Sequence, residues 1–446
     1  MTASNPVRYP DSRSRPLMTK RAWYLVVLGI LIPGSAQVLA GNRRLGRFGL
    51  GTTLLFWVLV AIAVIAVAVS RSVVVGIMTT PAVLWGLAAL VVFYTILWLI
   101  LGVNTLRLAR LVKTSPTARA LIAALSVIAL VGTTSVASYA LVNVAATIGV
   151  VGEVFSDGEI AAPVDGRYNI LLLGGDAGPD RIGLRPDSIS VVSIDAETGA
   201  IAIFGVPRNL ELAPFVEGSP MLGPYPNGYN CGDDCLVSYL YTYGQEHPDL
   251  YPAAAEAGST PGVEAMRDAV EGVLGMKIQY YVLIDMKGFA DLVDALGGID
   301  VNVKDRLPIG SNTDVHGNSV PPIGYIEAGK QHLNGRNALW YARSRYGTTD
   351  YDRMRRQREV QEAIFQQADP ANVITRFQAV AAAGSKVVST DIPQVMLGHF
   401  AGLAEKSRAF KVKKVEFVPP SWDVVHPDYD LIHTQVDLET APKPAS

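Results

Sequence analysis

The sequence predicts an α-helical membrane region followed by a domain that contains both short strands and helices. Long apolar runs are confined to the first third of the chain, whereas later apolar runs are short and alternate with helical patterns. With 446 residues, 50% of them hydrophobic, the chain is longer than one ordinary domain and too apolar to be soluble throughout. The 38 basic and 40 acidic residues nearly balance, so the overall charge does not indicate nucleic acid as a partner.

Four apolar segments make up the predicted membrane region at 22–147. Three of them reach the roughly 20 residues that a helix needs to cross a bilayer. These are 48–69, 82–103 and 120–142. The first segment, 22–40, is interrupted by Ile32-Pro33-Gly34-Ser35. Because Pro and Gly break helices, this segment either crosses the membrane or enters and returns on the same side.

The basic residues between the segments favour the re-entrant alternative. Basic clusters lie in the N-terminal segment 1–21, directly after the first apolar segment, and between the third and fourth segments. If the first segment crossed, the last two clusters would lie outside, against the tendency of Lys and Arg to remain in the cytoplasm. A re-entrant first segment places all three clusters in the cytoplasm. We therefore predict a multi-pass membrane protein whose following domain lies outside the cell.

After the membrane region, changes in composition predict the domain boundaries. Residues 148–167 are rich in Gly, Pro, Asp and Glu and are predicted to form a linker. The domain is predicted at 168–436, followed by a disordered tail at 437–446. The two cysteines, Cys231 and Cys235, are close enough to form a small disulfide loop in an oxidising compartment. Half of a metal site is the alternative, but no second cysteine pair exists to complete it.

Three short strands are predicted at the start of the domain, at 168–174, 189–195 and 200–207. In an antiparallel meander the first strand ends, the second begins and the third ends at the same edge of the sheet. The charged residues at these points are Asp176, Arg185, Asp187 and Arg208. Solvated turn charges are the alternative for any one of them. Together, however, carboxylates for Mg²⁺ and guanidinium forks for phosphate oxygens predict a phosphorylated substrate with a hard cation.

A second group of cations surrounds a long helix predicted at 351–368. A shorter helix at 334–342 leads into the tripeptide Arg343-Ser344-Arg345. At 100° per residue, one face of the long helix carries Arg353, Arg356 and Gln357 with Val360 and Ile364. The opposite face, predicted to point to water, carries Arg355, Arg358, Glu359 and Glu362. An arginine on an apolar face must bind an anion or reach solvent. Internal salt bridges would explain this helix alone, but Arg343 and Arg345 just upstream favour an anion pocket.

Six stretches of the domain together resemble the LytR-CpsA-Psr (LCP) family of cell-wall glycopolymer ligases. They are Leu173-Gly174-Gly175-Asp176, Arg185-Pro186-Asp187-Ser188, Val206-Pro207-Arg208-Asn209, Gly329-Lys330-Gln331-His332-Leu333-Asn334-Gly335, Tyr341-Ala342-Arg343-Ser344-Arg345 and Asp352-Arg353-Met354-Arg355-Arg356-Gln357. Each stretch alone is weak evidence, but the ordered set, over about 168–400, is specific. The sequence departs from the family in two ways: Asn209 replaces the usual Asp, and the family usually has one anchoring span.

The resemblance implies an α/β fold with a central mixed β-sheet flanked by helices, and an elongated apolar pocket for a polyprenyl chain. It also implies a pyrophosphate site made by Arg185, Arg208, Arg343, Arg345, Arg353, Arg356 and Gln357. Mg²⁺, or alternatively Mn²⁺, is expected on Asp176 and Asp187, and Asp187, Arg208 and Arg353 are the expected catalytic residues.

The activity that the resemblance implies is a phosphotransferase reaction that assembles the cell wall. A glycopolymer with one phosphate moves from a polyprenyl-pyrophosphate carrier to a peptidoglycan hydroxyl, that of muramic acid C6, and the lipid bilayer is a further partner. A pyrophosphatase and a non-catalytic lipid-phosphate sensor are the alternatives. The sequence contains no GxSxG, HExxH or P-loop GK[ST] pattern that would support a serine hydrolase, a zinc protease or a nucleotide enzyme.

Overall fold

The computed structural model divides into two units, Met1–Ile148 and Gly149–Ser446. It describes residues 7–69, 74, 77, 80–155, 158, 160–176, 185–232, 234–310, 320–344, 346–367 and 388–441.

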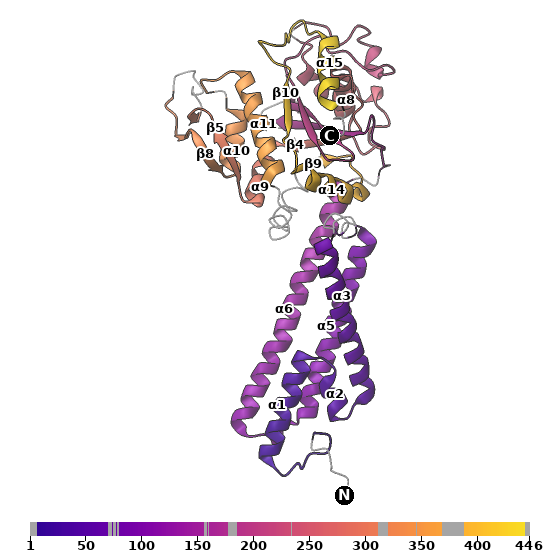
Figure 1. Ribbon diagram of the computed structural model, residues 1–446, viewed down its shortest axis with the longest axis vertical. Helices are drawn as coiled ribbons and strands as arrows, with labels where there is room; N and C mark the ends of the chain where they lie inside the picture. The colour runs from indigo at the N-terminus through magenta and orange to yellow at the C-terminus, as the bar shows by residue number, and fades with distance from the viewer. Residues whose placement is uncertain are drawn as a thin grey trace. The chain divides into compact units, whose positions relative to one another are not determined.

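The first unit is helical (Figure 1). Its helices include α1 (Arg15–Leu31), α2 (Ser35–Ala40), α3 (Arg43–Val69), α5 (Pro81–Ala109) and α6 (Pro116–Val154). Within the described residues, three helical segments are long and apolar enough to cross a membrane: Arg43–Val69, Pro81–Lys113 and Pro116–Gly149. They contain the three apolar segments predicted as spans, and together they indicate a membrane anchor.

The first apolar segment forms two helices because the chain breaks between α1 and α2. Gly34 lies at this break with φ +99°, a backbone conformation that favours glycine. A Cβ at Gly34 would lie 2.4 Å from the backbone nitrogen of Leu50 in α3, so only glycine fits. The buried Gln37 of α2 donates to the carbonyl of Leu101 at 2.8 Å and to Oγ1 of Thr105 at 3.0 Å. The predicted interruption is confirmed, and the re-entrant path stays a prediction.

Helix α6 continues beyond its predicted end. The linker predicted at 148–167 is wrong for its first residues, because α6 extends to Val154. Gly149, Gly152 and Glu153 suggested a loop, but each is tolerated at a modest cost inside a helix that is otherwise strongly apolar.

The second unit contains a mixed six-stranded sheet with helices on both sides (Figure 1). In spatial order its strands are β10 (Lys413–Glu416), β3 (Ile201–Val206), β2 (Arg185–Asp195), β1 (Arg167–Asp176), β4 (Tyr280–Asp285) and β9 (Val388–Thr390). Strands β1, β2 and β3 form the predicted antiparallel meander, whereas β1 pairs with β4, and β3 with β10, in parallel. The α/β class with a central mixed sheet is therefore confirmed.

One face of the sheet carries the main hydrophobic core. It packs against α7 (Leu240–Glu246), α8 (Pro261–Leu274) and α15 (Tyr429–Thr440). Leu171 and Leu173 of β1 belong to this core, because alternate residues of a strand point to the same face. Met266 and Val270 of α8 pack into the same cluster.

The other face of the sheet is covered by a second layer. This layer contains α9 (Met286–Leu296), α10 (Gly335–Arg343), α11 (Asp350–Gln367), α14 (Leu397–Ser407) and two small two-stranded sheets, β5 (Ile299–Val303) with β8 (Gly329–Leu333) and β6 (Leu307–Ile309) with β7 (Gly324–Ile326). Val293, Ile299 and Val360 form a separate core within it.

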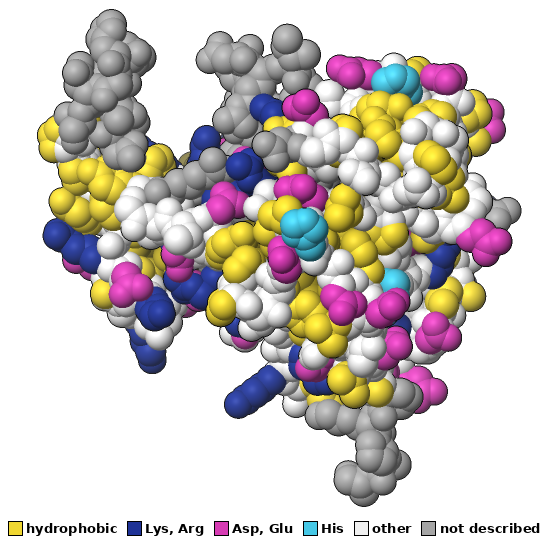
Figure 2. Space-filling view, turned by 90° about the horizontal axis from the view of Figure 1, so that it is seen from above, with side chains coloured by type: hydrophobic (Ala, Val, Ile, Leu, Met, Phe, Trp, Pro, Cys, Tyr) yellow, Lys and Arg dark blue, Asp and Glu magenta, His cyan; other side chains and the backbone are white. Residues whose placement is uncertain are grey.

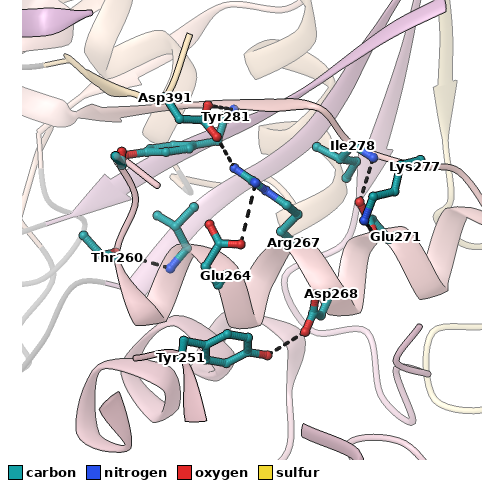
Figure 3. A network of polar contacts seen from close by, with 12 residues as sticks. Tyr251, Thr260, Glu264, Arg267, Asp268, Glu271, Lys277, Ile278, Tyr281 and Asp391 are labelled. Carbon is teal, nitrogen blue, oxygen red and sulfur yellow. Dashed lines mark hydrogen bonds and ion pairs between the residues drawn. The ribbon is translucent and has the colours of Figure 1, made fainter. Parts of the chain in front are cut away.

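A buried polar network attaches β9 to the rest of the sheet (Figure 3). Arg267 of α8 pairs with Asp391, just after β9, and lies 3.6 Å from Glu264. Asp391 in turn accepts a 2.7 Å hydrogen bond from the backbone nitrogen of Tyr281 in β4. Burial raises the pKa of the Asp391 carboxyl, and the nearby Arg267 charge opposes that effect. The network fixes β4, whose last residue, Asp285, caps α9 by accepting from the nitrogen of Gly288 at 2.8 Å.

The C-terminal segment is more ordered than predicted. The disordered tail predicted at 437–446 is wrong for its first residues, because α15 extends to Thr440. Asp428 caps this helix, and Ile432 and Val436 are buried against the main core. Lys413 lies 2.9 Å from Glu439, which holds the last turn of the helix against β10. Residues 442–446 lie outside the described residues.

Candidate functional site

The candidate site begins at the edge of the sheet where β1 ends and β2 begins. Asp176 pairs with Arg185 in the strand register, and Gly175 pairs with Pro186. The next pair joins Gly174 to Ser188, which leaves Asp187 as an extra residue on β2. Such a β-bulge re-aims the side chains beside it and is common next to functional sites. The meander therefore brings Asp176, Arg185 and Asp187 to one rim, as predicted.

Two carboxylates and two arginines form an ion-pair network at this rim. Nη1 of Arg208, which follows β3, donates to Oδ1 of Asp187 at 2.6 Å. Arg353 of α11 lies with Nη1 3.5 Å from Oδ2 of Asp187 and with Nη2 3.1 Å from Asp350. Nε of Arg208 is also 3.5 Å from Asp350. Three residues predicted for the site, Asp187, Arg208 and Arg353, are thus brought together.

The charges of this network are shielded to different degrees. The Arg353 side chain is only 2% exposed, so its charge depends on the carboxylates of Asp187 and Asp350. The Arg208 side chain is 31% exposed and can therefore meet a ligand from solvent. In the space-filling view, basic and acidic side chains gather in the indented region between the left-hand lobe and the main body of the domain (Figure 2).

Sequence reasoning did not include Asp350 in the site. This residue begins α11 and precedes Arg353 by one helical turn, a spacing that places two side chains on the same face. The preceding residue, Thr349, and Asp352 exchange hydrogen bonds in a capping box: Asp352 N donates to Thr349 Oγ1 at 3.1 Å, and Thr349 N donates to Asp352 Oδ2 at 3.1 Å. The only signal in the sequence was an acidic residue one turn before an arginine on the apolar face.

An apolar cavity of about 340 Å³ opens beside this network. Ile170 and Leu172 of β1 line it from the sheet, opposite Phe289 of α9, Leu339 of α10 and Ile364 of α11. The lining also includes polar residues of the site, namely Asp187, Ser188, Arg343 and Gln357. Oε1 of Gln357 is buried and has no hydrogen-bond partner among the described residues. A buried acceptor in this state indicates a missing donor or cation.

Arg356 was predicted to bind the anion, but its hydrogen bonds go to backbone carbonyls. Its Nε donates to the carbonyl of Tyr341 at 2.8 Å, and its Nη2 donates to the carbonyl of Ser344. Nη2 also lies 3.2 Å from Oγ1 of Thr348. Arg356 is buried, as predicted, but these contacts hold the loop between α10 and α11 in place.

The prediction that Arg358 points to solvent is wrong. Its side chain is 2% exposed, and Nε lies 3.1 Å from Oε1 of Glu416 in β10. Nη2 donates to Oγ of Ser188 at 3.2 Å. Helix α11 packs on the small sheet β5–β8 with one face and on the six-stranded sheet with another. The face that carries Arg358 is therefore also covered. Burial lowers the pKa of Arg358 and raises that of Glu416, and the attraction between the two charges opposes both shifts.

Arg185 makes a different kind of contact. Its guanidinium carbon lies 5.3 Å from the ring centroid of Tyr239, in a cation–π arrangement. Tyr239 belongs to the short 3₁₀ helix η3 (Val237–Tyr239), which follows the Cys231–Cys235 disulfide present in the structure.

Two residues predicted for the site lie partly or wholly outside the described part of the chain. The side chain of Asp176 and the whole of Arg345 lie outside the described part of the chain. Among the residues that are described, no cluster of three or more His, Cys, Asp or Glu side chains forms a metal site. The donor chemistry nevertheless fits a hard cation, because Asp187 offers carboxylate oxygens and the buried Oε1 of Gln357 is an acceptor without a partner.

Comparison with known proteins finds transferases named TagU among the relatives of this chain. The TagU protein of Bacillus cereus, named polyisoprenyl-teichoic acid–peptidoglycan teichoic acid transferase, is 27% identical over 228 residues, which are 51% of this chain and 60% of that protein. The protein of the same name from Halalkalibacterium halodurans is 28% identical over 229 residues, 50% of this chain and 61% of that protein. The chain therefore spans about three fifths of the length of these relatives.

Solved structures of the same kind are more distant. The crystal structure of B. subtilis TagV has a TM-score of 0.43 at 23% identity, and the match covers 63% of this chain and 100% of the TagV chain. The crystal structure of B. subtilis TagT has a TM-score of 0.41 at 20% identity, and the match covers 63% of this chain and 94% of the TagT chain.

A family model decides the assignment. The model of the LytR_cpsA_psr family matches residues 153–423, which is more than half of the chain. The matched segment contains the six-stranded sheet, the network of Asp187 and Arg208, and the lining of the cavity. The chain therefore belongs to the LytR-CpsA-Psr family.

Proposed function

We propose that this protein transfers a glycopolymer, with one phosphate, from a polyprenyl-pyrophosphate carrier to a hydroxyl of peptidoglycan. The names of its relatives support this class of reaction, since they are transferases that join a polyisoprenyl-linked teichoic acid to peptidoglycan.

One observation carries the proposal: the charged network and the apolar cavity adjoin one another. Polar side chains that include Asp187, Arg343 and Gln357 contribute to the lining of the cavity, and most of the remaining lining residues are aliphatic or aromatic. A polyprenyl pyrophosphate likewise has a charged part and an apolar part, because a compact anion is joined to a long apolar chain. Apolar side chains would bury the chain, and guanidinium groups would bind the phosphate oxygens.

In the proposed reaction, the glycan-side phosphorus changes its oxygen partner. The hydroxyl oxygen of the acceptor forms a bond to the phosphorus on the glycan side, and the bond from that phosphorus to the bridging oxygen breaks. The electron pair leaves with the polyprenyl phosphate, and the proton of the hydroxyl passes to a carboxylate at the rim, Asp187 or Asp176. Arg208 and Arg353 stabilise the charge that develops on the phosphoryl oxygens, and Arg185, Arg343 and Arg345 add to the binding of the anion.

Asp176 and Asp187 would hold Mg²⁺, or Mn²⁺ in its place, and the bound ion would supply positive charge to the pyrophosphate. Asp187 already lies between two guanidinium groups, so its negative charge is compensated before any ligand arrives. Arg356 keeps the loop that follows α10 in place and thereby positions Arg343.

We further propose that the catalytic domain lies outside the bacterial cytoplasm. Three membrane-crossing helices after a cytoplasmic N-terminus would bring the chain out of the cell, where peptidoglycan is located.

The test uses the full chain in phospholipid nanodiscs. It is incubated with a defined polyprenyl-pyrophosphoryl glycan, Mg²⁺ and peptidoglycan oligomers, and the products are identified by mass. The expected product is a peptidoglycan oligomer heavier by the glycan and one phosphate, together with polyprenyl phosphate.

Two control reactions make the result specific. Omitting the oligomer distinguishes a transferase from a pyrophosphatase, because a pyrophosphatase would release glycan phosphate at the same rate without an acceptor. A protein that binds the lipid but yields neither product would be a sensor, and the proposed function would be wrong.

A further inference from the structure

Among the residues that the structure describes, Arg185 is held by an aromatic ring and not by a carboxylate. Its guanidinium lies against the face of Tyr239, 5.3 Å from the ring centroid. Within the described part of the chain, Arg185 forms no ion pair. Its position at the start of β2, opposite Asp176 in the register, puts it on the same rim as Asp187.

Other arginines of the site either donate their N–H groups to protein carbonyls or have their charge compensated by a carboxylate. Arg208 and Arg353 are paired with the carboxylates of Asp187 and Asp350. Arg356 donates to two backbone carbonyls. An aromatic face attracts a guanidinium through the charge distribution of the ring and leaves the N–H groups in the guanidinium plane free. Arg185 therefore keeps its donors and its charge available for a phosphate.

Tyr239 is itself fixed by the segment to which it belongs. The backbone nitrogen of Val237 donates to the carbonyl of Leu210 at 3.1 Å, and that of Ser238 donates to the carbonyl of Arg208 at 3.0 Å. Just before this segment, Cys235 is buried in the main core and bonded to Cys231. Tyr239 packs against the same core. One short segment thus holds the backbone of Arg208 and the side chain of Arg185.

We propose that Tyr239 is a positioning residue for the anion site: its ring holds the Arg185 guanidinium at the rim with its hydrogen-bond donors free for the lipid-linked pyrophosphate. This inference rests on the proposed function. It assigns the role to the ring of Tyr239 and not to its hydroxyl, so phenylalanine should replace it and a flexible apolar side chain should not.

The experiment measures two quantities on the full chain in nanodiscs: affinity for inorganic pyrophosphate by calorimetry, and the rate of glycan transfer. Tyr239→Phe should keep both within about a factor of two. Tyr239→Met fills similar space without a ring face and should weaken both roughly tenfold, the order expected for a partly desolvated cation–π contact. Tyr239→Leu repeats the test with another apolar shape in case the Met variant does not fold.

A double-variant cycle separates positioning from a general loss of stability. In the Arg185→Ala background, Tyr239→Met should cause no further loss, because a residue that acts through Arg185 has nothing left to position. Tyr243→Met is the matched control. Its ring stacks on His247, with centroids 4.1 Å apart, and contacts no arginine among the described residues, so the control should match wild type.

The outcomes are distinct. Full binding and transfer by Tyr239→Met, or losses in Tyr239→Met and Arg185→Ala that simply multiply, would overturn the inference and leave the proposed function standing. Wild-type protein that neither binds pyrophosphate nor transfers glycan would overturn the proposed function and this inference with it.

Discussion

The carboxylate of Asp187 accepts a 2.6 Å hydrogen bond from the guanidinium of Arg208; Asp187 lies in β2, and Arg208 follows the neighbouring strand β3. Asp187 also lies 3.5 Å from Arg353, so one carboxylate joins the sheet edge to helix α11. Any cation that binds Asp187 must share its oxygens with these arginines or displace them. In the proposed mechanism, this competition would couple the binding of the metal to the binding of the anion at Asp187.

Asp187→Asn should therefore change the dependence on metal more than it changes the fold. The amide keeps the shape of the side chain but removes the hard, charged oxygen ligand that Mg²⁺ prefers. We expect the variant to need a several-fold higher Mg²⁺ concentration for half-maximal transfer, measured by titrating the metal after removal with EDTA. Unchanged transfer by this variant in the absence of any divalent ion would exclude Asp187 as a metal ligand.

The capping box of α11 gives a prediction on pH. The Thr349 hydroxyl donates to Asp352 at 2.8 Å, and this hydrogen bond lowers the pKa of Asp352 from its ordinary value. A carboxyl whose pKa is lower in the folded state stabilises the protein above its unfolded pKa, and the contribution is lost as the pH falls through the folded value. Asp352→Asn lacks this contribution.

The difference in thermal midpoint between wild type and Asp352→Asn should consequently shrink as the pH falls below about 4. Thermal unfolding followed by circular dichroism at a series of pH values measures it. Thr349→Val should also weaken this pH-dependent contribution, because it removes the hydrogen bond from the Thr349 hydroxyl to Asp352. It should in addition be less stable at every pH, because the Thr349 hydroxyl no longer accepts from the Asp352 nitrogen. A difference that stays constant across this pH range would show that Asp352 does not contribute in its charged form.

The meander and the inward face of α11 were predictable because both depend on local patterns. Alternation along β2 and a tight turn before β3 were enough to place Asp187 and Arg208 on one rim. The burial of Arg353 followed from its spacing to Val360 along the helix.

The residues whose roles were predicted wrongly or missed depend on contacts from distant parts of the chain. A helical wheel assumes one covered face, but Glu416 of β10 covers the second face of α11 and pairs with Arg358. The backbone carbonyls that occupy Arg356 cannot be identified from residue types. Asp350 resembled an ordinary residue at a helix start, and only the fold brings it to Arg208.

The Arg358–Glu416 pair should govern stability. Removing one member of a buried pair leaves the other charge uncompensated, at a cost of about 3–5 kcal/mol. Arg358→Met should thus lower the thermal midpoint strongly, and Arg358→Met combined with Glu416→Gln should recover part of the loss. Differential scanning fluorimetry of the full chain measures both. If the double variant is no more stable than Arg358→Met, the pair is not the cause.

Membrane topology can be tested with reporter fusions. The basic residues at both ends of the first apolar segment predict that a reporter after Gly46 lies in the cytoplasm and one after Phe155 lies outside. Alkaline phosphatase is active only outside the cytoplasm and therefore distinguishes the two. Strong phosphatase activity from the Gly46 fusion would contradict the re-entrant path of α1 and α2.

Helix α11 supplies a matched pair of arginines for the proposed chemistry. Arg353 is 2% exposed and contacts Asp187 and Asp350, whereas the Arg355 side chain is 35% exposed and pairs with Glu359 at 2.6 Å. Arg353→Ala should lower glycan transfer on the order of a hundredfold or more, because it removes charge stabilisation of the transition state. Arg355→Ala should stay within about a factor of two, since Arg355 does not contact Asp187 or Asp350 among the described contacts and its partly exposed ion pair contributes little.

Both variants have the same residue type, the same helix and the same substitution, so the comparison isolates the position of the charge. Because Arg353 is buried, its removal should also lower the thermal midpoint, and transfer is therefore compared at a temperature where both variants are folded. Arg353→Lys provides a second measure, because it keeps the charge but loses the fork that contacts two carboxylates. Equal losses in Arg353→Ala and Arg355→Ala would show that the network around Asp187 is not the site of the transfer reaction.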